Sequence, residues 1–95
     1  MDYEAARSIV RSVIHGWDPY SLLAGGAPHD EWDDEIVRVV ARVPEIEAAP
    51  DAARVVSEVF STAFHPDEFS TTECTEVGQR LYHQLAESGL LRRGT

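Results

Sequence analysis

Residues 32–43 read Trp-Asp-Asp-Glu-Ile-Val-Arg-Val-Val-Ala-Arg-Val, and this stretch decides the fold class. Its large apolar residues recur at intervals of three and four, which places them on one face of an α-helix: Trp32, Ile36, Val39, Val40 and Val43. Acids crowd the first turn and arginines lie toward the other end, in agreement with the helix dipole. We therefore expect an amphipathic helix that has its N-cap at Asp30 and ends at Pro44.

Two other stretches show the same periodicity and carry end signals of their own. The first begins after an N-cap at Asp2 and reaches Gly16, a residue type that commonly ends helices. The second runs from about residue 50 or 51 to Phe64, where the dipeptide His65-Pro66 forces a stop. Its valines would also suit a strand, but the length and spacing of the stretch favour a helix.

A last helix is expected after residues 70–73, Ser-Thr-Thr-Glu, which have the pattern of a capping box. Four residues at helical spacing are expected to form its buried stripe: Cys74, Val77, Leu81 and Leu85. Gly89 supplies the end of this helix. Leu90 can then fold back onto the last turn as the hydrophobic contact of a Schellman-type cap.

Together these stretches predict an all-α fold, a compact bundle of about four helices. The chain has 95 residues, the size of one domain, so residues 1–95 are expected to form a single helical domain. No segment alternates apolar and polar residues with period two, which disfavours a sheet. Residues 17–28 contain glycines and prolines, and we expect an ordered Gly/Pro loop between the first two main helices, packed onto the core through Tyr20, Leu22 and Leu23.

The residues from Trp17 onward resemble those of the YugE-like family of small bacterial helical proteins, a domain of unknown function. The resemblance rests on Trp17-Asp18-Pro19, Leu22-Leu23, Gly26-Ala27-Pro28, Asp30-Glu31 and Glu35-Ile36. It continues through the helical stretches that follow, and Trp32 stands where the family is expected to have tyrosine. The resemblance implies a small α-helical fold. It implies no activity and assigns no catalytic or ligand-binding residue.

Charge limits the classes of partner. Seventeen acids face eight arginines and no lysine, which gives a net charge of -9. Nucleic acid and anionic membranes attract clustered basic residues, so neither is an expected partner. A basic protein is the expected class instead. The sequence has no apolar run long enough to cross a membrane and one cysteine, and we expect a cytoplasmic protein; whether it forms a homo-oligomer stays open.

The densest group of acids lies in residues 30–35, Asp-Glu-Trp-Asp-Asp-Glu. The alternating ligands and the glycine of an EF-hand loop are absent, so the group is not expected to form a calcium cage. It suits the start of a helix, and it can also face a partner. Because Trp32 and Ile36 point inward, we expect three carboxylates to project outward as the candidate partner-binding residues: Glu31, Asp34 and Glu35.

No motif in the sequence indicates a catalytic, cofactor-binding or metal-binding site. His15, His29, His65 and His83 occur in neither a His-Glu-x-x-His nor a Glu-x-x-His pattern, so structural or surface roles are expected for them. Cys74 is expected to be a small buried apolar residue. No cofactor is expected.

Two classes of function remain. The first is a non-catalytic, acidic protein-interaction module, of the immunity or antitoxin type, that covers a basic partner. The second is a small-molecule or metal-binding enzyme that uses carboxylates near the loop in residues 17–35. The chain length leaves little room for a deep pocket, so we expect no enzyme and take the interaction module as the leading hypothesis.

Overall fold

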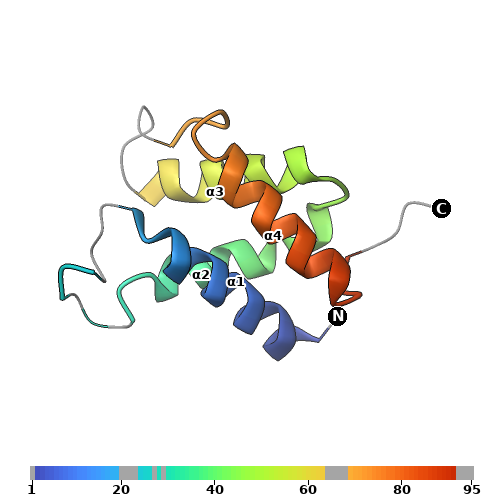
Figure 1. Ribbon diagram of the computed structural model, residues 1–95, viewed down its shortest axis with the longest axis horizontal. Helices are drawn as coiled ribbons and strands as arrows, with labels where there is room; N and C mark the ends of the chain where they lie inside the picture. Colours follow the sequence, from blue (N-terminus) through green and yellow to red (C-terminus); the bar gives the residue numbers. More distant parts are fainter. Residues whose placement is uncertain (1, 20–23, 27, 29, 64–68, 92–95) are drawn as a thin grey trace.

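The computed structural model describes residues 2–19, 24–26, 28, 30–63 and 69–91. This part of the chain forms four α-helices and no strand, which confirms the all-α prediction (Figure 1). The α-helices are α1 (Tyr3–Trp17), α2 (Asp33–Ala41), α3 (Ala49–Ala63) and α4 (Thr75–Glu87), and the 3₁₀-helix η2 (Val43–Glu45) follows α2. Among the described helices, none has the length and apolar content needed to cross a membrane.

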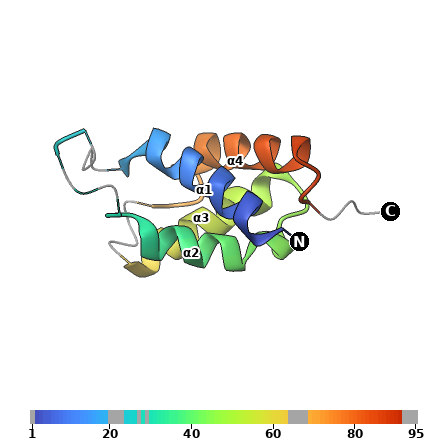
Figure 2. The same cartoon turned by 90° about the horizontal axis from the view of Figure 1, so that it is seen from below.

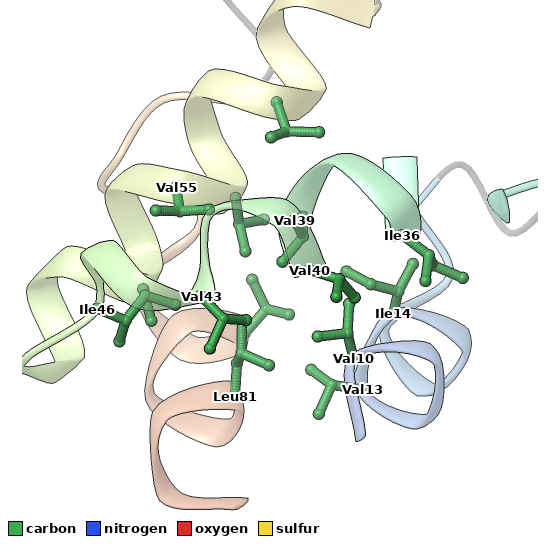
Figure 3. Packing of buried hydrophobic residues seen from close by; sticks show 14 of the residues in the cluster. Val10, Val13, Ile14, Ile36, Val39, Val40, Val43, Ile46, Val55 and Leu81 are labelled. Carbon is green, nitrogen blue, oxygen red and sulfur yellow. The ribbon is translucent and has the colours of Figure 1, made fainter. Parts of the chain in front are cut away.

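Each α-helix packs against two others, because α1 contacts α2 and α4, and α3 contacts the same two helices. Figure 2 shows α4 and α2 on opposite sides of the molecule, with α1 and α3 between them. The predicted stripe of residues 32–43 is buried, with no member more than 2% exposed. Figure 3 shows Ile36 and Val40 of α2 facing Val10 and Ile14 of α1, so these residues join the two helices within the core.

The first helix begins as predicted, since an Asp2 carboxylate oxygen accepts a hydrogen bond from the Ala5 N–H at 3.1 Å. The prediction that Gly16 ends it is wrong. The helix continues through Gly16 to Trp17 and ends at Asp18, which has a left-handed φ of 42° and donates its N–H to the Ile14 carbonyl at 2.8 Å. Aspartate is one of the few side chains that tolerate this conformation, so the helix does not need glycine there.

The second helix is shorter than predicted at both ends. It begins at Asp33 with Trp32 in the N-cap position, so the prediction of Asp30 as the N-cap is wrong. A turn built from backbone bonds takes that place, in which the Asp33 N–H donates to the Asp30 carbonyl at 3.1 Å. At the other end, the α-helix stops at Ala41, and Pro44 lies within η2, whose tighter turns tolerate proline near their start.

The third helix matches its predicted start within two residues, and its predicted end at Phe64 and His65-Pro66 lies outside the described residues. The fourth helix begins at Thr75, after a turn over residues 71–74. Ser70 still caps this turn, because its Oγ accepts the Glu73 N–H at 3.2 Å. The expected apolar stripe of the fourth helix is buried throughout: Cys74, Val77, Leu81 and Leu85.

The end of α4 confirms the predicted Schellman-type cap. Gly89 has a left-handed φ of 77° and donates its N–H to the Ala86 carbonyl at 3.1 Å. The Leu90 N–H donates to the Leu85 carbonyl at 3.1 Å, and the Leu90 side chain packs against the core. Both backbone bonds of this motif are therefore present.

The predicted packing of Tyr20, Leu22 and Leu23 lies outside the described residues.

Two helical glycines have opposite surroundings. A Cβ atom added to Gly78 of α4 would lie 2.6 Å from the Cα and N atoms of Ala53 in α3. Backbone cannot move aside as a flexible side chain can, so α3 and α4 can approach this closely only because residue 78 is glycine. A Cβ atom added to Gly16 would have its nearest such neighbour at 3.8 Å, the Nη1 atom of Arg80. Neither packing nor backbone conformation requires glycine at position 16.

We expect Gly78→Ala to lower the free energy of unfolding by ~1–3 kcal/mol, because the added methyl group forces α3 and α4 apart. The matched substitution Gly16→Ala should raise it by ~0.5–1 kcal/mol, since alanine favours the helix and has room. Urea denaturation followed by circular dichroism measures both changes. Equal effects of the two substitutions would contradict the close approach at Ala53.

Candidate functional site

Three exposed acids surround the start of α2, and we call Asp30, Glu31 and Asp34 the α2 acidic face. Within the described part of the chain, none of the three forms an ion pair. Some acids elsewhere form ion pairs with arginines. Arg42, for example, binds Glu45 at 2.9 Å and Glu58 at 2.6 Å. The α2 acidic face is thus a group of exposed carboxylates that form no ion pair with any described arginine.

Asp33 is set apart from this face. Its carboxylate lies 4.0 Å from the Nη2 atom of Arg7 on α1, and both side chains are partly exposed. At this distance and exposure the pair adds little to stability. It turns the Asp33 charge toward α1 and leaves the neighbouring Asp34 on the outer side of the helix.

The prediction that Glu35 projects outward is wrong, because Glu35 is only 7% exposed. Residue 35 follows Trp32 by three positions and precedes Val39 by four, so helical geometry places it beside two members of the buried stripe. Burial raises the pKa of the Glu35 carboxyl above its ordinary value, and repulsion from Asp34 adds to the effect. Of the three predicted partner-binding residues, the structure leaves Glu31 and Asp34 exposed.

Asp18 fixes the segment that precedes the acidic face. Its Oδ1 atom accepts the indole N–H of Trp32 at 3.2 Å, and its Oδ2 atom accepts the Ala24 N–H at 3.0 Å. One carboxylate therefore joins the end of α1, the following loop and the start of α2. Asp18 is one of the carboxylates of residues 17–35 that the alternative of an enzyme would use, whereas here both of its oxygens accept hydrogen bonds from the chain itself. The spacing of Asp18 and Trp32 in the sequence gives no signal of this bond.

Aromatic rings pack beneath the segment that joins the end of α1 to the start of α2. Trp17 contacts Phe60 and Phe69 edge to face, with ring centroids 5.0 and 5.8 Å apart. Phe60 also contacts Trp32, at 5.7 Å. The Ser57 and Ser61 hydroxyls donate to the Phe69 carbonyl, which ties the segment before α4 to α3. The rings thus hold α1, α2 and α3 together at one end of the molecule.

The structure describes the cysteine and two of the four histidines, of which His15 is half-buried in the last turn of α1. His83 is exposed and contacts the ring of Tyr82, while His29 and His65 lie outside the described residues. Cys74 is fully buried, as predicted, and burial raises the pKa of its thiol to about 11, with Glu73 adding to the shift. Among the described residues, no group of three or more His, Cys, Asp or Glu side chains could hold a metal ion.

Several hollows lie on the described surface, and two of them lie between pairs of helices, apart from the acidic face. A cleft of about 260 Å³ between α1 and α4 is lined by Gly16, Trp17, Glu73, Glu76, Val77 and Arg80. A wider and more open groove of about 750 Å³ between α2 and α3 is lined by Arg38, Ala41, Arg42, Glu58, Val59 and Thr62. Neither of these two hollows could be predicted from the sequence, because each one forms only when two helices pack.

We expect Trp32→Ala to lower the free energy of unfolding by ~3–5 kcal/mol, because it empties the space beneath the start of α2. Trp32→Phe keeps a ring there and removes the indole bond to Asp18, so about 1–2 kcal/mol is expected. Chemical denaturation of both variants gives the comparison. A loss below about 1 kcal/mol for the alanine variant would contradict the burial of Trp32.

A pH dependence follows from Glu35. Because its pKa is higher in the folded state, the folded protein binds that proton more tightly, and stability falls as the pH rises through the folded pKa. Glu35→Gln removes the free-energy cost of holding an ionised carboxylate in this buried position. It should therefore raise the thermal midpoint at pH 7, and the gain should shrink as the pH approaches 4. Glu47→Gln, at an exposed acid, is the control. A gain independent of pH would contradict the assignment to Glu35.

Searches of curated proteins and of solved structures each found no match to this chain. A family model described as a domain of unknown function, DUF1871, matches residues 9–89. The match runs from within α1 to the glycine that closes α4, so it includes most of α1 and the whole of α2, α3 and α4. The chain therefore belongs to this DUF1871 family of uncharacterised small domains.

Proposed function

We propose that this protein is a non-catalytic interaction module that binds a basic protein through the α2 acidic face. The observation that carries the proposal is the group of exposed acids Asp30, Glu31 and Asp34, none of which is ion-paired within the described residues. The net charge of -9 extends the same sign over the molecule. A potential of one sign raises the rate at which an oppositely charged partner arrives.

The residues beneath this face are well packed, which favours a docking role. Trp32 is fully buried directly before α2, and Asp18 fixes its indole. The helix dipole offsets only about half of one charge, so the carboxylates at the helix start keep a net negative potential. Exposed carboxylates act mainly on encounter and orientation, and we expect apolar contacts elsewhere to supply most of the affinity.

An immunity or antitoxin role, with a basic toxin as the partner, is the finer form of this proposal. A small acidic domain that covers a basic surface would suit such a role. A cytoplasmic location belongs to the same proposal, and a free thiol at Cys74 agrees with it.

Reversing the charge of the face tests the proposal. Glu31→Arg with Asp34→Arg should lower the association rate with a captured partner by ~10-fold or more at low salt, and should flatten the salt dependence. The fold should survive, because both side chains are exposed. Glu35 is left unchanged, since an arginine in its buried position would unfold the helix start.

Glu47→Arg with Glu87→Arg is the matched control, because it makes the same change in net charge at exposed acids away from the start of α2. Capture from cells with the three proteins as bait should retain the partner on the wild type and the control, and lose it on the Glu31/Asp34 variant. Stopped-flow association at two ionic strengths then measures the rates. Equal rates for the two double variants would remove the α2 acidic face from the mechanism.

A further inference from the structure

The cleft between α1 and α4 shares no lining residue with the α2 acidic face, and Figure 2 shows α2 and α4 on opposite sides of the molecule. Gly16 and Trp17 of α1 form one wall. Val77 and Arg80 of α4 form the other, with the acids Glu73 and Glu76. Its volume of about 260 Å³ is below the usual range for a small-molecule site and suits one long side chain.

Gly16 is the first observation that points to a ligand. It is the last residue but one of α1, its backbone is helical, and a Cβ atom would have room there. Alanine favours the helical backbone over glycine, so the fold by itself does not require glycine at this position. The side chain missing from position 16 leaves open the wall of the cleft. A group from a partner can therefore enter the cleft beside Gly16.

Arg80 shows what kind of group the cleft accepts. Its Nη1 atom lies over Gly16, and its Nη2 atom lies 3.7 Å from a Glu76 carboxylate oxygen. The guanidinium of the chain itself thus occupies the rim. It is held loosely, because the Glu76 side chain is 89% exposed and the Arg80 side chain 46% exposed. A pair this exposed gains little free energy and can be displaced by a competing cation.

The remaining walls also suit a cation. Glu73 is exposed and forms no ion pair with any described residue, so a second carboxylate is open at the cleft. Trp17 is partly buried, and its contacts with Phe60 and Phe69 fix its ring. A cation within about 6 Å of a tryptophan ring is attracted to it, and the guanidinium of arginine does this most often.

We propose that the α1–α4 cleft binds an arginine side chain of a protein partner. The stem of that side chain lies against Gly16, Trp17 and Val77, and its guanidinium replaces that of Arg80 beside Glu73 and Glu76. The site is distinct from the α2 acidic face, so either surface can fail its test without affecting the other.

Nuclear magnetic resonance titration with N-acetyl-arginine N-methylamide tests the proposal on the full chain. We expect saturable shifts of the Gly16 and Val77 amides and of the Trp17 indole N–H, while the indole of the buried Trp32 stays unchanged. The citrulline analogue has nearly the same shape without the charge, and should bind at least ~10-fold more weakly. Equal shifts with both compounds, or no saturable shift with the arginine compound, would overturn the proposal.

Two variants move the affinity in opposite directions. Glu73→Gln with Glu76→Gln should weaken binding by ~5-fold or more, whereas Arg80→Gln should strengthen it by ~3-fold or more by removing the internal competitor. Arg54→Gln is the control for the second change, because it removes the same charge from α3. A gain no larger for Arg80→Gln than for Arg54→Gln would overturn the proposal, even if the double glutamine variant fails to fold.

Discussion

The burial of Trp32 is the constraint on which the rest of the structure depends. Its ring lies against Phe60 of α3, and its indole N–H is held by Asp18 at the end of α1. One side chain directly before α2 therefore fixes the positions of three helices at the same end of the molecule. The direction of α2 follows from this anchor, and so does the side of the helix on which each acid lies.

Much of the fold could be predicted because the apolar stripes need no tertiary information. The stripe that begins at Trp32 and the one that begins at Cys74 are buried in full. The start of the second helix was harder to predict, because an aspartate such as Asp30 occupies the N-cap only when no backbone turn satisfies the same N–H groups. The role of Gly78 could not be predicted, because it depends on Ala53 in another helix.

The candidate site was predictable only in part. The helical periodicity correctly predicted that Glu31 and Asp34 lie on the surface. It predicted a buried face that is narrower than the real one, so the prediction for Glu35 was wrong. A face that begins with a residue as large as Trp32 covers its neighbours in the next turn, whatever their polarity. The cleft beside Gly16 was missed for a different reason: the sequence shows only a glycine near a helix end, and the cleft exists only once α4 packs beside it.

The buried thiol of Cys74 makes the chain suited to measurements of its own fluctuations. It is the single sulfhydryl group in the sequence, and it is fully enclosed where α4 begins. A thiol-specific reagent requires both access and the ionised form, and the intact core withholds both. Modification at neutral pH must therefore wait for the start of α4 to separate from its neighbours. The labelling rate then reports the equilibrium of that local opening, without an introduced cysteine or dye.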